Sequence, residues 1–147
     1  MVRRLVAALA TGLALSGGAL ALDYRSVSVP VALFYDVPSA QGKKLFMVKE
    51  GTPLEVLVQV EGWTKVRDAE GTIAWIDRNA LAARRTLVVT APMADVRQSA
   101  SAESPLVFQA EKWVILELLE AAPMGWAKVK HRDGASGYVR ITQVWGL

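Results

Sequence analysis

Cysteine is absent from the 147-residue sequence, and histidine occurs once, at His131. The lack of cysteine excludes disulfides, thiol nucleophiles and thiolate metal sites. A single histidine with scattered carboxylates matches none of the ligand spacings of zinc or calcium sites. The sequence therefore predicts no metal and no cofactor, and a fold that depends on hydrophobic burial.

Catalytic groups are equally scarce. His131 precedes Arg132 and Asp133 in an expected hairpin turn, where a Ser-His-Asp arrangement would lack buried neighbours and an oxyanion site. No spacing of Asp and Glu selects a pair of carboxylates for acid–base chemistry. We therefore predict no catalytic residue and a protein that is not an enzyme.

A strong excess of charge is also missing. The sequence has 17 Lys and Arg against 14 Asp and Glu. Arg3 and Arg4 precede residue 22 and no acid does, so the remaining chain is close to neutral. Its charges alternate in sign, whereas nucleic-acid binding needs a concentrated basic face. Nucleic acid is therefore not an expected partner.

The apolar run at residues 5–15 is too short for a bilayer span, which needs about 20 residues. Two arginines precede this run, and Ala19-Leu20-Ala21 follows it as a small-x-small site. This order is typical of a secretory signal peptide. We predict a signal over residues 1–21 with cleavage after Ala21, a periplasmic or secreted location, and no membrane insertion after cleavage. A retained membrane anchor is the alternative.

The sequence contains an internal repeat. The phrase "GWTKVRDAEGTIAWI" at residues 62–76 returns at residues 125–139 as "GWAKVKHRDGASGYV", with Trp63 on Trp126. Upstream, residues 29–37 align without gaps on residues 88–96. The two copies of the upstream block lie closer together along the chain than residues 62–76 and their copy do. This difference predicts four extra residues in the loops of the second unit. Two blocks in the same order indicate duplication.

Each unit has the pattern of β-structure. "WTKVR" alternates its side chains between two faces, and glycine-containing turns follow at residues 68–71 and 132–134. Outside the first 21 residues no helical period is sustained, apart from a possible single turn at 78–82. We predict an all-β fold of two tandem small barrels, residues 24–82 and 86–147, packed as one rigid body. A barrel of the oligonucleotide-binding type is the nearest rival.

Two stretches resemble the bacterial Src-homology-3-like (SH3-like) domain family. "EGTPLEVLVQVEGWTKVRDAEGTIAWI", residues 50–76, is similar to the second half of that domain, and "ADVRQSASAESPLV", residues 94–107, to its opening loop. The first unit departs from the pattern, with Pro38 aligned on Arg97 and the loop glycine displaced to Gly42. The resemblance implies small barrels that act outside the cytoplasmic membrane and bind peptidoglycan peptides or protein partners.

Recurring aromatic residues are the candidate ligand-binding groups. Trp63 and Trp126 share one repeat position, and Trp75 and Tyr138 share another. These rings either cover the open end of each barrel or form a shallow groove with Tyr35. Aromatic side chains offer a large contact area, and their polar tips suit peptide or sugar surfaces.

Trp113 and Trp145 have no aromatic counterpart in the first unit. They either seal the interface between the barrels, which two small domains need, or form a partner site of the second unit. We favour the seal.

Together these observations predict an exported, non-catalytic binding module of the cell envelope that binds peptidoglycan or its stem peptides. The alternative is an adaptor that docks onto another envelope protein. The near-neutral charge favours a protein partner, and the family resemblance favours the wall.

Expression in an exporting host should give a mature protein that begins at Leu22, because signal peptidase cleaves after small-x-small sites. Mass spectrometry of the purified protein measures this. A chain that starts at Met1 in the membrane fraction would contradict cleavage.

Overall fold

The computed structural model describes residues 22–147, so the predicted signal peptide and its cleavage site lie outside the described residues. The first seven strands are β1 Tyr24–Val27, β2 Val31–Tyr35, β3 Lys44–Lys49, β4 Pro53–Val60, β5 Trp63–Arg67, β6 Ile73–Asp77 and β7 Leu81–Ala82. The second seven are β8 Thr86–Val89, β9 Met93–Arg97, β10 Leu106–Glu111, β11 Ile115–Ala122, β12 Trp126–Lys130, β13 Ser136–Arg140 and β14 Val144–Trp145. Three short 3-10 turns, η1 Arg78–Ala80, η2 Pro123–Gly125 and η3 Ile141–Gln143, complete the elements.

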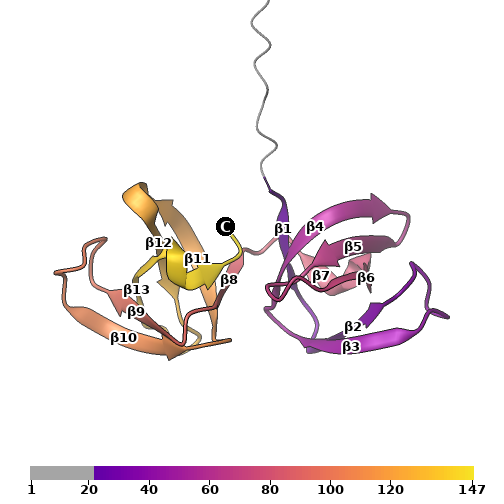
Figure 1. Cartoon of the computed structure of the whole chain (residues 1–147), viewed down its shortest axis with the longest axis horizontal. Helices are drawn as coiled ribbons and strands as arrows, with labels where there is room; N and C mark the ends of the chain where they lie inside the picture. The colour runs from indigo at the N-terminus through magenta and orange to yellow at the C-terminus, as the bar shows by residue number, and fades with distance from the viewer. Residues whose placement is uncertain (1–21) are drawn as a thin grey trace, which may run out of the picture.

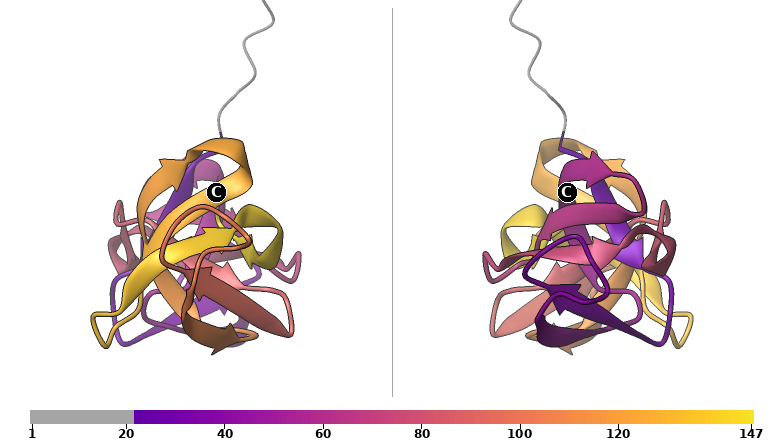
Figure 2. Two further views of the ribbon diagram at one scale, coloured as in Figure 1. Left: turned by 90° about the vertical axis from the view of Figure 1, so that its left-hand side faces the viewer. Right: turned by 90° about the vertical axis from the view of Figure 1, so that its right-hand side faces the viewer.

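The strands form two separate sheets with the same topology. Their orders are β3-β2-β6-β5-β4-β1-β7 and β10-β9-β13-β12-β11-β8-β14, so each strand has a counterpart seven places along the chain. Figure 1 shows the two strongly curved sheets side by side along the long axis, and Figure 2 shows each from its own end. The predicted all-β fold of two tandem small barrels is confirmed. No helix in the described part of the chain is long and apolar enough to cross a membrane.

The structure corrects the upstream alignment of the repeat. Tyr35 lies opposite Trp75, and Arg97 lies opposite Tyr138 in the equivalent ladder. Tyr35 and Arg97 therefore share one position, whereas the expected alignment placed Tyr35 on Ala94, three positions earlier. A slip by an odd number exchanges the two faces of a strand. The expected alignment would have placed buried Phe34 on an exposed residue of β9.

Only one residue, and not four, is inserted into the second barrel. For β1 to β4, the number of residues between a position and its counterpart in the second barrel is constant. From β5 onward this number is larger by one. The extra residue falls in the turn between β11 and β12, where Pro123–Gly125 replaces the pair Glu61 and Gly62. The loop after β2 has the same length as the loop after β9, so Arg97 has Tyr35 as its counterpart and not Pro38.

Each barrel has its own small core. Phe34, Leu54, Val66 and Ile76 are fully buried in the first barrel. The second core is built from equivalent positions, which are Val96, Leu116, Val129 and Val139. A domain of about 60 residues buries only about 60% of its unfolded surface, so each barrel gains stability from its neighbour.

The seam between the barrels combines aromatic packing with hydrogen bonds. The rings of Tyr24 and Trp145 meet edge to face with centroids 5.2 Å apart, and the Arg85 guanidinium lies 5.2 Å from the Tyr24 centroid. Arg85 also donates a 2.7 Å hydrogen bond to the carbonyl of Gly146. Burial here, together with the nearby Glu55 carboxylate, raises the pKa of the Tyr24 phenol.

Two further hydrogen bonds cross the seam close to the connection. The Thr86 hydroxyl donates to the Gly51 carbonyl at 2.6 Å, and the Ser26 hydroxyl donates to the Arg84 carbonyl at 2.7 Å. The connection between β7 and β8 is only residues 83–85, so the two barrels are tied by a short link as well as by side chains.

Trp145→Ala should lower the stability of the protein by about 3 kcal/mol, because it removes a packed indole from the seam. Wild-type protein should unfold in one calorimetric transition, whereas the variant should show two, since the barrels no longer stabilise each other. Met47→Ala, at a side chain that is 78% exposed, is the control and should change stability by less than about 0.5 kcal/mol. An unshifted single transition for Trp145→Ala would contradict coupling through the seam.

Candidate functional site

Four side chains share the outer face of the first barrel where β2, β6 and β5 run side by side. Tyr35 lies opposite Trp75, and Trp75 lies opposite Lys65. Trp63 is two residues from Lys65 and therefore points to the same side. The intervening residues of β5 and β6 face the core and are buried. We call Tyr35, Trp63, Lys65 and Trp75 the aromatic face.

The aromatic face is ordered by its own contacts and remains partly open. The rings of Tyr35 and Trp63 meet at 84° with centroids 5.2 Å apart, the edge-to-face arrangement that aromatic pairs prefer. The Lys65 ammonium lies 5.9 Å from the centroid of the Trp75 ring, within range of a cation–π interaction. All four residues are half-buried, so the face offers apolar rings and a cation to a ligand.

The loop that follows Tyr35 is fixed in shape. The Asp36 carboxylate accepts a 2.8 Å hydrogen bond from the Lys43 backbone N–H. Gly42 suits this turn, because a Cβ there would lie 2.7 Å from Val37 Cγ2 and 3.0 Å from the Ser39 carbonyl oxygen. The glycine that departs from the family pattern in sequence therefore closes the loop in this barrel.

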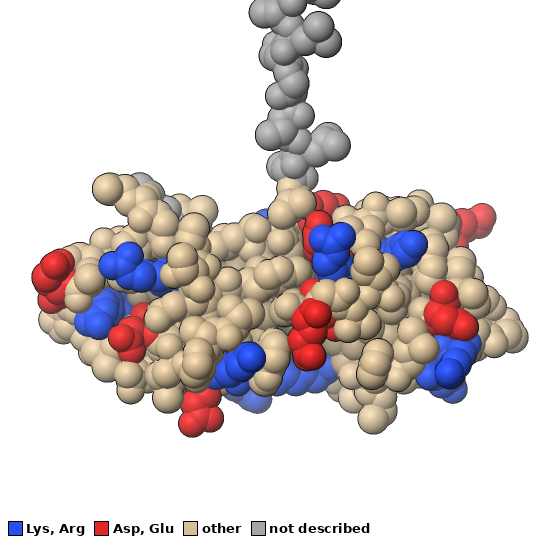
Figure 3. Space-filling view, viewed as in Figure 1, with Lys and Arg blue, Asp and Glu red and all other residues tan. Residues whose placement is uncertain are grey.

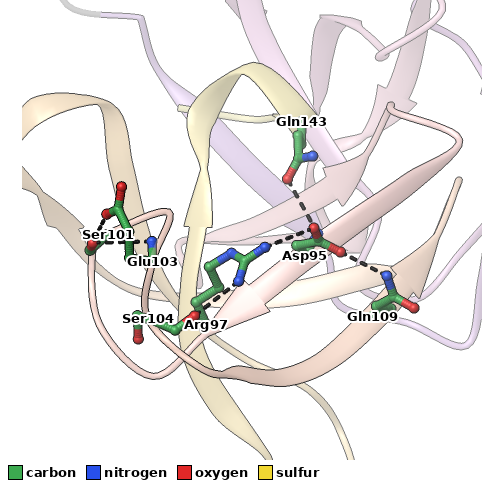
Figure 4. Close-up of polar contacts among 7 residues, drawn as sticks. All are labelled: Asp95, Arg97, Ser101, Glu103, Ser104, Gln109 and Gln143. Carbon is green, nitrogen blue, oxygen red and sulfur yellow. Dashed lines mark hydrogen bonds and ion pairs between the residues drawn. The ribbon is translucent and has the colours of Figure 1, made fainter.

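The equivalent face of the second barrel has a different chemistry. Arg97 replaces Tyr35 and donates hydrogen bonds to the Ser104 carbonyl at 2.9 Å and to the Asp95 carboxylate at 3.2 Å. The side chain of Gln109 donates to the same carboxylate at 2.8 Å, and the side-chain oxygen of Gln143 accepts from the Asp95 backbone N–H at 3.3 Å. Figure 4 shows this network, which engages the arginine with the barrel itself.

Trp126 is also less available than its counterpart. It is only 6% exposed, and the Arg140 guanidinium lies 4.6 Å from its ring centroid. Arg140 is its cross-strand neighbour, whereas the neighbour of Trp63 at that position is Asp77. An arginine can stack on an indole and a carboxylate cannot, so the two tryptophans differ in exposure.

The structure therefore places the five candidate ligand-binding residues in two groups. Tyr35, Trp63 and Trp75 lie together on the first barrel, and Trp126 and Tyr138 lie on the equivalent face of the second. The Lys128 ammonium lies 6.0 Å from the Tyr138 centroid, in the same way that Lys65 lies over Trp75. These assignments remain predictions about binding.

The two unpaired tryptophans lie in different surroundings. Trp145 packs at the seam, as described above, while Trp113 lies in the turn between β10 and β11 and is 40% exposed. Sequence reasoning missed Phe46 and Met47, which are strongly exposed on β3. The signal was available, because "KKLFMVK" is an apolar strand that begins and ends with lysines.

His131 lies in the hairpin turn between β12 and β13. Its Nδ1 is 3.1 Å from the Asp133 carboxylate. A hydrogen bond from the Ala135 backbone N–H, followed by the contact with His131, lowers the pKa of Asp133. Within residues 22–147, no three His, Asp or Glu side chains gather closely enough to hold a metal ion.

Comparison with known families identifies both barrels. Residues 28–82 and residues 90–146 each match the family model described as the bacterial SH3 domain. The chain therefore belongs to the bacterial SH3 domain family and contains two copies of the domain. A comparison with curated proteins gives no match.

The solved structures that match this chain include NlpC2 and NlpC1 from Trichomonas vaginalis, and an NlpC/P60 family protein from Bacillus cereus. Sequence identities are 13%, 14% and 14%, and TM-scores are 0.40, 0.40 and 0.39. The alignments cover 87%, 93% and 83% of this chain, and 49%, 50% and 55% of the other chains. This chain thus spans about half the length of those proteins.

Trp126→Ala should destabilise the protein by about 3 kcal/mol or more, because a nearly buried indole leaves a cavity. Trp63→Ala should cost clearly less, since that ring is partly exposed. Urea unfolding followed by circular dichroism measures both values. Equal losses would contradict the difference in exposure between the two faces.

Proposed function

We propose that the protein is a non-catalytic binding module of the cell envelope, and that the aromatic face of the first barrel binds peptidoglycan or its stem peptides. The observation that carries the proposal is the half-exposed cluster of Tyr35, Trp63 and Trp75 beside Lys65. Membership in the bacterial SH3 domain family supports a binding role. The protein acts in the periplasm or outside the cell, after removal of residues 1–21.

The chemistry of the aromatic face suits a short peptide attached to a sugar polymer. Aromatic rings provide contact area with little loss of side-chain entropy, and the phenol and indole tips donate hydrogen bonds to peptide carbonyls. The Lys65 ammonium can pair with a carboxylate of a stem peptide, because it lies at the edge of the same cluster. The face therefore has groups for each part of such a ligand.

Electrostatics favour short-range recognition over long-range attraction. Figure 3 shows acidic and basic side chains interspersed on one side of the molecule, with wide uncharged areas between them. A surface of this kind produces little steering of an acidic polymer. Binding to the wall should therefore depend on the aromatic contacts and only weakly on salt.

The alternative function, an adaptor that docks onto another envelope protein, is favoured by one observation. Trp113 exposes 40% of its surface near the seam, where an interface residue would be expected. The two functions use different surfaces, so they are not exclusive.

Purified protein should sediment with isolated peptidoglycan, and Tyr35→Ala or Trp75→Ala should reduce the bound fraction at least fivefold. Each change removes one ring of the aromatic face. Tyr138→Ala is the matched control, because it removes the counterpart of Trp75 from the second barrel. Its bound fraction should remain within a factor of two of wild type.

Two results would contradict the proposal. The wild-type protein could remain in the supernatant, or all three variants could bind as wild type does. Release of soluble wall fragments by the purified protein would show instead that it is a hydrolase.

A further inference from the structure

A second surface, separate from the aromatic face, lies in the seam between the barrels. It is a groove of about 340 Å³. One wall is Phe46, Met47 and Lys49 of β3 with Asp68 and Glu70 of the β5–β6 turn, and the other is Trp113 and Ile115 of the second barrel. Phe46 and Met47 are 59% and 78% exposed. The groove shares no residue with the aromatic face, and many of its lining residues are apolar.

Trp113 has an unusual backbone conformation for a tryptophan. Its φ is 74°, in the left-handed region, where bulky residues are rare. The equivalent residue of the first barrel is Gly51, with a φ of 82°. A side chain in this region typically costs about 1 kcal/mol relative to glycine. The duplicated barrel thus shows that glycine suffices for the turn, and the indole is an addition that lines the groove.

The apolar groove continues into a basic one. A neighbouring hollow of about 610 Å³ shares Lys49 and Ile115 with it, so the two meet at these residues. Its lining includes Arg84, Lys130, His131 and Arg132. The seam therefore carries apolar side chains together with the acids Asp68 and Glu70 at one end, and an excess of cations at the other.

The charges of the basic end are not balanced by the barrel itself. Glu117 pairs with Arg84 at 3.0 Å and also lies opposite Lys130 in the β11–β12 ladder. Its carboxylate is thus engaged with Arg84, and Glu50 is the other acid of the lining. Within the described residues, Lys130 and Arg132 take part in no ion pair. Positive charge is left at this end of the groove.

The wall formed by β3 favours an extended occupant. β3 is the edge strand of its sheet, and four consecutive residues, 46–49, line the groove. An exposed edge strand offers backbone groups for pairing with another strand. The groove therefore suits a peptide that runs along β3.

We propose that this groove binds an extended segment of a partner protein, with a large apolar side chain against Trp113, Phe46 and Met47, and with carboxylates beside Lys130 and Arg132. Apolar contact supplies the affinity, and charge complementarity sets the direction of the segment. The inference rests on the adaptor alternative and deepens it, since it names the surface and the chemistry of the partner segment, and it is independent of wall binding.

A second copy of the chain fits the groove poorly. Antiparallel pairing of β3 with its own copy would place Lys44 opposite Lys49 at both ends, and like charges directly opposite each other are destabilising. Lys49 borders the basic end, which would thus face another cation, whereas this end attracts an acidic segment.

Phage-displayed random peptides, selected on the purified full-length protein, provide the probe. Enriched peptides should contain an apolar or aromatic residue followed or preceded by two or more acids. Trp113→Gly should weaken binding of a synthetic enriched peptide at least tenfold in fluorescence anisotropy. It should leave the thermal midpoint nearly unchanged, because glycine is the residue of the sister turn. Lys130→Gln with Arg132→Gln should weaken the same peptide at least fivefold and flatten its dependence on salt.

Tyr35→Ala, on the other barrel face, is the control and should bind the peptide as wild type does. Loss of binding in this variant, or normal binding to Trp113→Gly, would place the peptide elsewhere and overturn the proposal. If the enriched peptides lack acids, the proposed role of Lys130 and Arg132 is overturned. If selection on the wild-type protein enriches no peptide more strongly than selection on Trp113→Gly does, the whole proposal is overturned. A wild-type dimer that Trp113→Gly dissociates, measured by analytical ultracentrifugation, would make a second copy the occupant instead.

Discussion

The contact of Arg85 with the Tyr24 ring, and of Tyr24 edge to face with Trp145, is the one on which the rest of the structure depends. It joins the first strand of one barrel to the last strand of the other. Neither barrel has a disulfide, and each buries a core of a few aliphatic residues and one or no aromatic ring. Because domains of this size are marginal alone, apolar area buried at the seam contributes to both. The same contact positions the two walls of the seam groove.

Duplication has given two copies of one fold with different surfaces. The cores match position by position, since Leu54, Val66 and Ile76 correspond to Leu116, Val129 and Val139. The outer faces have diverged, with Tyr35 replaced by Arg97 and Asp77 by Arg140. The second barrel thus has Trp126 covered by Arg140 and Arg97 engaged in hydrogen bonds, where the first barrel has an open aromatic cluster. The differences between the barrels thus lie in outward-facing side chains and not in the cores.

Much of the fold could be predicted from the sequence. Alternation in "WTKVR" and the glycine turns predicted β5, β6 and their counterparts, because strand period and turn chemistry are local properties. The upstream alignment was wrong by three positions, since short apolar stretches align equally well in several registers. The correct one is selected by the strand pairing and by the burial of Ala32 and Phe34, both of which depend on the folded sheet.

The candidate site was also predictable only in part, because a side chain's exposure depends on neighbours that meet in the folded sheet. Sequence alone groups Trp63 with Trp126 because they share a motif, but their exposures depend on the cross-strand residues Asp77 and Arg140. The groove beside Trp113 could not be predicted, because it is formed by β3 and the β5–β6 turn of one barrel and by Val88, Trp113 and Ile115 of the other. Its walls meet only when the barrels pack.

The most direct test of the central claim, that the first barrel presents the wall-binding face, uses the indole N–H signals of the five tryptophans in a nitrogen-15 NMR spectrum. Soluble stem peptides prepared from peptidoglycan are titrated into the labelled protein, and each signal is assigned by single substitution. The account predicts that the signals of Trp63 and Trp75 shift progressively, while those of Trp126 and Trp145 remain in place. Stationary signals for Trp63 and Trp75, or shifts confined to the second barrel, would contradict it.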